Sequence, residues 1–174
     1  MSIPSSRGPD LPLPLWAFVP GETAPAVADH DTLWQAKALV PSRFCEYVPA
    51  RHPALRYGMA LNDRGYFWES QEILEAVWAA APQGGRERIL LRACIQIANA
   101  NLRLRMDKPR AAARLLNEAL AELDRLDLRK AVAGGDGFAD RFPTAALAEQ
   151  ARAKLAQPVL SKAEWLKFGA VGRV

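Results

Sequence analysis

The 174-residue chain has few of the residues that build disulfide scaffolds, metal centres or membrane spans. It holds two cysteines and two histidines, and no run of eighteen apolar residues. Two cysteines so far apart exclude a disulfide scaffold and a zinc site of ordinary spacing. No secretory leader is recognisable at its start, which predicts a reduced, cytoplasmic protein with no membrane span. No stretch alternates convincingly at period two, so an all-α fold is expected.

Cofactor motifs are also missing. The glycine-rich stretch at residues 134–137 has neither the lysine nor the preceding strand of a phosphate-binding loop, so it predicts a turn. No serine stands in a nucleophile elbow. His30 and His52 have no partner at a ligand spacing. We therefore expect no cofactor and no metal.

The formal net charge of +4 directs attention to residues 86–130, which hold eleven lysines and arginines against six acidic residues. The basic side chains are spread over two predicted helices, and no aromatic residue lies among them. Binding of phosphates needs a contiguous basic stripe, and binding of single strands needs stacking rings. The pattern favours a solvated surface, so nucleic acid is an unlikely partner. A basic nucleic-acid adaptor is kept as an alternative.

Proline is concentrated at the start, because nine of the thirteen prolines lie within residues 1–53. Proline removes backbone donors and fixes φ, which predicts an irregular arm. One short helix is expected from a cap at Asp31 to a point before Pro41. Burial would stabilise the aromatic side chains of this arm, so we expect it to pack on the helical body. Those side chains are Trp16, Phe18, Trp34, Phe44 and Tyr47.

Helical periodicity begins at residue 54. It predicts helices over residues 54–64, 66–81 and 86–106, a fourth that starts after an Asp107 cap and runs towards residue 130, and a fifth over 143–157. Ser161 and Glu164 form a capping box that predicts a last short helix. Residues 54–130 are expected to be the core domain, which residues 131–174 complete. The expected architecture is a compact orthogonal bundle of about five main helices.

A weak internal repeat relates residues 65–74 to residues 107–116. Each copy is a turn followed by a helix in which a small residue, Ser70 or Ala112, precedes an apolar pair. Stacked helical hairpins of the tetratricopeptide kind would produce this pattern. Two hairpins are too few for a free-standing solenoid, so a compact bundle with such hairpins is predicted.

Residues 57–78 carry the most informative motif: an asparagine, a glycine, an aromatic pair, and then glutamates spaced by three before a tryptophan. This pattern resembles the bacterial and archaeal family called domain of unknown function 309, in which Glu-x-His-Glu-x-x-Glu-x-x-Trp follows the aromatic pair. The matching residues are Asn62, Gly65, Tyr66, Phe67, Glu69, Glu72, Glu75 and Trp78, and Gln71 replaces the histidine. The resemblance covers about residues 55–125. It implies a small all-helical fold and no known activity.

A candidate polar pocket lies between the second and third core helices. Gln71 and Glu75 share one margin of the second helix, Glu69 lies on the other, and Glu72 projects away from the apolar centre. The third helix carries a polar stripe formed by Arg92, Gln96, Asn99 and Arg103. A buried polar group without a partner costs about 1–3 kcal/mol, so the stripe should pair with Gln71, Glu75 or Glu69. The candidate site residues are Asn62, Glu69, Gln71, Glu72, Glu75, Arg92, Gln96, Asn99 and Arg103. Of these, Glu69, Glu72 and Glu75 are weak candidates for metal ligands.

Two main hypotheses for the function follow, one from the helical hairpins and one from this pocket. The favoured one is a non-enzymatic helical scaffold or interaction module that offers a groove to a peptide or protein. The alternative is an enzyme that depends on a small ligand or a divalent metal, in which oxygen ligands alone would suit Mg²⁺ or Ca²⁺. The loss of the histidine weighs against acid–base chemistry. The sequence leaves the oligomeric state and the identity of the partner open.

Overall fold

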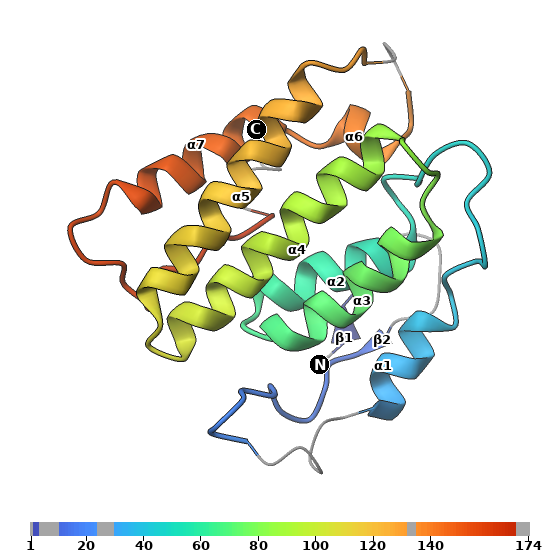
Figure 1. Ribbon diagram of the computed structural model, residues 1–174. Helices are drawn as coiled ribbons and strands as arrows, with labels where there is room; N and C mark the ends of the chain where they lie inside the picture. Colours follow the sequence, from blue (N-terminus) through green and yellow to red (C-terminus); the bar gives the residue numbers. More distant parts are fainter. Residues whose placement is uncertain (1, 4–10, 24–29, 132–134, 170–174) are drawn as a thin grey trace.

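The computed structural model describes residues 2–3, 11–23, 30–131 and 135–169. In these residues it contains seven helices and one short antiparallel sheet, so the all-α prediction is confirmed (Figure 1). The sheet pairs Ser2 with Pro12 and Ile3 with Leu11. The elements are β1 (Ser2–Ile3), β2 (Leu11–Pro12), α1 (His30–Lys37), α2 (Pro53–Asp63), α3 (Phe67–Ala80), α4 (Arg86–Arg105), α5 (Pro109–Asp127), α6 (Phe138–Arg141) and α7 (Thr144–Leu155).

Two helical hairpins form the body of the protein. The longer hairpin consists of α4 and α5, and the shorter one consists of α2 and α3. The α3 helix packs against both α2 and α4, and α7 packs against α5 (Figure 1). Pro53 and Pro109 lie in the first turns of α2 and α5. Backbone N–H groups in the first turn have no partner within the helix, so the missing N–H of proline costs no hydrogen bond there. Gly65 has a φ of 89° between α2 and α3, a conformation that glycine adopts without strain.

The core is built from leucines and isoleucines of α2, α3, α4 and α5. Each such side chain contributes about 1.5–3 kcal/mol when it is fully buried. At Gly58 of α2, an added Cβ would lie 3.0 Å from Leu74 Cδ2 and 3.1 Å from Ile73 Cγ2 of α3. The Ser70 hydroxyl donates to the Gly58 carbonyl at 2.6 Å. These contacts explain why the two helices lie so close at this point.

The six longer helices lie within a few residues of their predicted positions, but two predicted caps are wrong. The α1 helix begins at His30, which puts Asp31 inside its first turn. Lys108 is the N-cap of α5, and Asp107 has a φ of 56°. The Asp107 carboxylate instead accepts a hydrogen bond from Lys162 Nζ at 2.9 Å. The short helix α6 was not predicted.

The predicted last helix at Ser161 is also wrong, because residues 160–169 form no helix. A helix would use the carbonyls of Ser161 and Glu164 as acceptors for backbone N–H groups. In the structure, Lys154 Nζ donates hydrogen bonds to both of these carbonyls. The Leu166 N–H donates to the side chain of Asn101. Side chains of the body therefore replace the backbone partners that the capping box would need.

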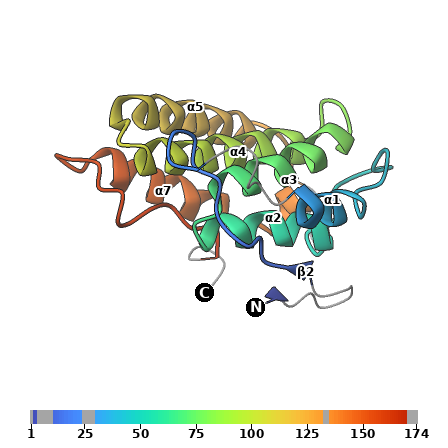
Figure 2. The same ribbon diagram turned by 90° about the horizontal axis from the view of Figure 1, so that it is seen from below.

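The N-terminal residues 11–23 run across the helices (Figure 2). The Tyr57 hydroxyl donates to the Pro12 carbonyl at 2.6 Å, and the ring of Phe18 meets Trp68 edge-on at 5.0 Å. Val19 is buried beside Phe67. The proline-rich residues 4–10 and 24–29, like Gly134 of the predicted glycine turn, lie outside the described residues.

Three aromatic side chains that we expected to be buried are exposed: Trp16 at 53%, Trp34 at 71% and Tyr47 at 41%. The α1 helix buries Leu33 on the face that it packs against α2 and α3, and this turns the neighbouring Trp34 outwards. The expectation of burial was therefore wrong for these three, whereas Phe44 is buried.

Candidate functional site: a polar pocket and a clamp on an extended segment

The three glutamates of α3 point to three different surroundings. Glu69 is fully buried and accepts a hydrogen bond from the Phe18 N–H at 2.6 Å. Glu72 pairs with Lys37 Nζ of α1 at 2.7 Å, and Glu75 lies on the side of α4. Among the described residues, no group of three or more histidine, cysteine, aspartate or glutamate side chains is arranged to hold a metal ion. The dispersed glutamates give no support to a metal-dependent reaction.

An open pocket of about 490 Å³ does lie between α3 and α4. Trp78, Ala79 and Ile95 supply its apolar walls. Five of the nine candidate residues line it: Gln71, Glu75, Arg92, Gln96 and Asn99. The other four candidates, Asn62, Glu69, Glu72 and Arg103, are not among its lining residues.

The polar stripe of α4 finds its partners on α5 rather than on α3. Gln96 Nε2 donates to Glu118 Oε2 at 2.9 Å, and Arg92 Nε lies 3.8 Å from Glu122 Oε1. Gln71 Nε2 donates to the Phe67 carbonyl of its own helix at 3.3 Å. The expected pairing across α3 and α4 was therefore wrong. It failed because α5 lies along α4 and offers carboxylates to the same stripe.

Glu75 is the carboxylate of this pocket, and partial burial raises its pKa, helped by repulsion from Glu72 and opposed by Lys37. The native state thus binds this proton more tightly than the unfolded state. The resulting stabilisation is present below the unfolded pKa and is lost as the pH rises through the folded pKa.

We expect Glu75→Gln to raise the free energy of unfolding at pH 7 by a few tenths of a kcal/mol, a small value because the side chain is largely exposed. The gain should vanish near pH 3, where the carboxyl is protonated in both states. Thermal unfolding at both pH values measures the difference. Glu149→Gln, at an exposed position of α7, is the control. A gain that is equal at both pH values would contradict the assignment.

Five of the eleven basic residues of 86–130 lie within 4 Å of a carboxylate. The partners come from the N-terminal segment, α5 and α6. The pairs are Arg86–Asp140, Arg92–Glu122, Arg105–Glu22, Arg114–Glu118 and Arg125–Glu122. Only Asp140 and Glu22 lie outside residues 86–130, so these pairs offset two of the five excess positive charges. Pairing of these five arginines lowers the charge available to phosphates, which weighs against a nucleic-acid interface.

A second arrangement, not predicted from the sequence, is centred on two buried asparagines. Asn101 Nδ2 donates to Asn62 Oδ1 at 2.8 Å and to the Leu166 carbonyl at 2.9 Å. Asn101 Oδ1 accepts from the Leu166 N–H at 3.0 Å, and Asn62 Nδ2 also donates to the Leu166 carbonyl at 3.0 Å. Both backbone groups of Leu166 are therefore bound by side chains of α2 and α4.

The next three residues of the chain are bound in the same way. Gln150 of α7 accepts from the Lys167 N–H at 2.8 Å and donates to its carbonyl at 3.1 Å. Asp63 at the end of α2 accepts from the N–H groups of Phe168 at 2.7 Å and Gly169 at 2.6 Å. We call Asn62, Asp63, Asn101 and Gln150 the segment clamp, and residues 165–169 the C-terminal segment.

Side chains of the C-terminal segment alternate between the body and solvent, and the chain bends at Phe168 and turns at Gly169. Leu166 and Phe168 are each 1% exposed, whereas Lys167 between them is exposed. Trp165 donates from Nε1 to the Asn62 carbonyl at 3.1 Å, and its ring lies edge-on to Phe67 at 5.6 Å. The body thus supplies both backbone hydrogen bonds and side-chain contacts to this segment.

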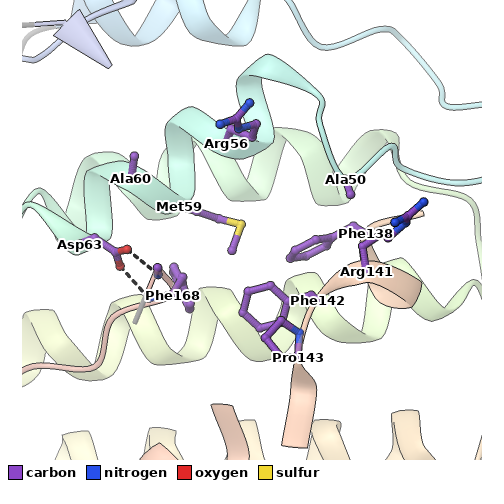
Figure 3. Close-up of a pocket in the computed structure, with 11 residues that line it drawn as sticks. Ala50, Arg56, Met59, Ala60, Asp63, Phe138, Arg141, Phe142, Pro143 and Phe168 are labelled. Atoms are coloured by element: carbon purple, nitrogen blue, oxygen red, sulfur yellow. Dashed lines mark hydrogen bonds between the residues drawn. The ribbon is translucent and has the colours of Figure 1, made fainter. Parts of the chain in front are cut away.

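Phe168 also forms one wall of a cavity of about 460 Å³ (Figure 3). Met59, Phe138 and Phe142 point towards the same space, and the Asp63 carboxylate reaches the segment at one end. Burial raises the pKa of Asp63, although the N–H groups of Gly169 and Phe168 oppose the shift.

Lys154 of α7 controls the turn that leads into the segment. The residue is 4% exposed, and its ammonium donates to the carbonyls of Ser161 and Glu164. Burial lowers the pKa of Lys154, and the charge of Glu164 opposes this shift. A single side chain thereby fixes the chain direction just before Trp165.

Asn62 was a candidate from its motif, but its clamp partners were not. Asn101 carried a usable signal, because an amide within an otherwise apolar stretch of α4 needs a buried partner. Asp63 and Gln150 lie among residues that are usual on helices, so the sequence held no signal that marked them as clamp residues.

The fold and the clamp define an all-α protein built on two helical hairpins that hold an extended segment of chain. Residues 55–115 match the family described as Domain of unknown function (DUF309). The match includes the segment that carries the motif, and it is to the family that the sequence resembles. No curated protein and no solved structure matches the chain. None of the helices among the described residues has the length and apolarity that a membrane span requires.

Proposed function

We propose that the protein is a non-enzymatic helical interaction module that binds an extended polypeptide segment on the segment clamp. One observation carries the proposal: four side chains of the body bind the backbone of residues 166–169. The chain's own C-terminal segment occupies the clamp in this structure. A partner segment would bind in its place.

The chemistry of the clamp supports this function. The hydrogen bonds from its amide and carboxylate groups to residues 166–169 all go to backbone N–H and C=O groups, which every peptide presents. Recognition of extended peptides generally combines main-chain hydrogen bonds with pockets for alternate side chains. The clamp has both, since Leu166 and Phe168 are buried on either side of an exposed Lys167.

The clamp also depends on the family-matched part of the chain. Asn62, Asp63 and Asn101 lie inside residues 55–115, and the C-terminal segment lies outside them. The matched helices supply the binding groups, and a separate piece of chain supplies the ligand. An enzyme receives less support, because Glu75 is the one carboxylate that lines the α3–α4 pocket.

The test is exchange of the C-terminal segment. A protease site is introduced at Val159, which is 80% exposed, and the purified full chain is cut so that both pieces are retained. A dye-labelled peptide Ser-Lys-Ala-Glu-Trp-Leu-Lys-Phe-Gly is then added. We expect the cut piece to stay bound and the peptide to replace it in a saturable manner, followed by fluorescence anisotropy.

The matched variants are Asn101→Leu and Asn117→Leu, the second being an exposed amide of α5 that bonds only within its helix. We expect Asn101→Leu to weaken peptide binding at least tenfold, because each lost buried hydrogen bond is worth roughly 1–3 kcal/mol. Asn117→Leu should have little effect. A peptide that never displaces the cut piece, or that binds the two variants equally, would refute the proposed function.

A further inference from the structure

We infer that the clamp recognises a particular order of residues, Leu-x-Phe-Gly, in a chain that bends at the phenylalanine, and that its partner is a protein carrying such a segment. The inference rests on the proposed function and adds the chemistry of the ligand. It follows from how each side chain of the C-terminal segment meets the body.

The first position takes a leucine-sized apolar side chain. Leu166 is 1% exposed, and both of its backbone polar groups are bound by the asparagine pair. A polar side chain here would be carried into the core together with the fixed backbone. Such a group would lose its hydration without gaining a partner.

The third position takes an aromatic ring. Phe168 is 1% exposed and meets the ring of Phe142 edge-on at 6.5 Å, and its N–H is fixed by Asp63. It also walls the cavity beside Met59 (Figure 3). A ring at this position is favoured because edge-to-face contacts add to the area that it buries.

The fourth position favours glycine. A Cβ at residue 169 would lie 2.8 Å from Asp63 Oδ2, the same oxygen that accepts the Gly169 N–H. A side chain here would make the carboxylate shift and weaken its hydrogen bond. This contact gives the clamp a preference for glycine.

The second position is free. Lys167 is exposed, and its Nζ lies 4.7 Å from the centre of the Trp165 ring, a residue of the same segment. Its backbone is held by Gln150, which does not depend on the side chain. This position should accept any residue that can adopt an extended conformation.

A partner segment must compete with the chain's own copy. A tethered segment has an effective concentration in the millimolar range, so a partner needs either several contacts or a high local concentration. The chain's own C-terminal segment shows which backbone groups and side chains bind to the clamp. A partner that displaces it therefore presents the same Leu-x-Phe-Gly order.

The inference is tested with variants of the nine-residue peptide on the cut full chain. We expect Phe168→Ala to weaken binding roughly thirtyfold or more. We expect Gly169→Ala to weaken it roughly tenfold, because of the overlap with Asp63. Lys167→Ala, the matched control, should change the affinity by less than about threefold.

The possible outcomes separate the two proposals. If the unaltered peptide binds and all variants bind equally well, the Leu-x-Phe-Gly inference is wrong and the proposed function stands. If no peptide binds, both are wrong. A dimer of copies that exchange their own segments, and that no peptide dissociates, would also overturn the inference. Should the cut chain unfold, the same peptides are added to the uncut chain carrying Phe168→Ala, and a thermal shift in the same order supports the inference.

Discussion

Replacing Asn101 by leucine is expected to lower the free energy of unfolding by about 3–5 kcal/mol, because several buried polar groups lose their partners at once. Asn101 is 1% exposed and links Asn62 to both backbone groups of Leu166. Leucine has the same branching but is larger, so no cavity is left and the loss combines the missing hydrogen bonds with the extra volume of the two methyl groups. Urea unfolding followed by circular dichroism measures it.

The control is Asn117→Leu, which removes an exposed amide from α5 and should change the stability by less than about 0.5 kcal/mol. Equal effects of the two substitutions would mean that Asn101 does not organise the clamp. The NMR signal of the Trp165 indole N–H gives a second readout, because this group donates to the Asn62 carbonyl. We expect the signal to shift in Asn101→Leu and to stay unchanged in Asn117→Leu.

The second large effect is expected at Gly58. Gly58→Val adds a branched side chain where a single Cβ already lies 3.0 Å from Leu74 Cδ2 and 3.1 Å from Ile73 Cγ2. Overfilling a packed core costs about 1–3 kcal/mol, and separation of α2 from α3 would also strain the hydrogen bond from Ser70. We expect a loss of about 2–4 kcal/mol by urea unfolding.

Ala60→Val provides the comparison, because Ala60 is on the same helix and borders the cavity instead of α3. It introduces the same side chain without the overlap. Its helix-propensity cost is about 0.5 kcal/mol relative to alanine, whereas valine in place of glycine has no such cost. If both variants lost the same stability, the close approach of α2 and α3 at Gly58 would not matter to the fold.

The sequence predicted the helices well where their periodicity is strong and their ends are marked by proline or glycine. Pro53, Gly65 and Pro109 each lie at a predicted boundary, and the apolar spacing of α5 matches its buried face. Cys94 lies in an apolar stretch of α4 and is fully buried. These features depend on local conformation, which a sequence records directly.

Contacts between distant segments could not be predicted in the same way. The spacing of Ser161 and Glu164 is that of a capping box, yet Lys154 and Asn101 bind the groups that a helix would use. Likewise, the partner of Glu69 is the Phe18 N–H, 51 residues earlier. A local pattern cannot reveal that a side chain elsewhere in the chain competes for the same backbone groups.

The candidate site was predicted in part for the same reason. Helical spacing correctly put Gln71 and Glu75 on one margin of α3, and they line a pocket with three residues of α4. Spacing on one helix does not say which neighbour covers it. The stripe of α4 therefore found Glu118 and Glu122 of α5 instead of α3.

The central claim is that side chains of the helical body bind the backbone of the C-terminal segment. Amide hydrogen exchange of the full chain, followed by NMR, tests it at the N–H groups of Leu166, Lys167, Phe168 and Gly169. These groups lie outside regular secondary structure, yet each donates to a clamp side chain. We predict exchange at least about a hundredfold slower than in the free peptide, with the protection at Leu166 lost in Asn101→Leu. Exchange at the rate of the free peptide, in a chain whose α4 and α5 amides stay protected, would contradict the claim.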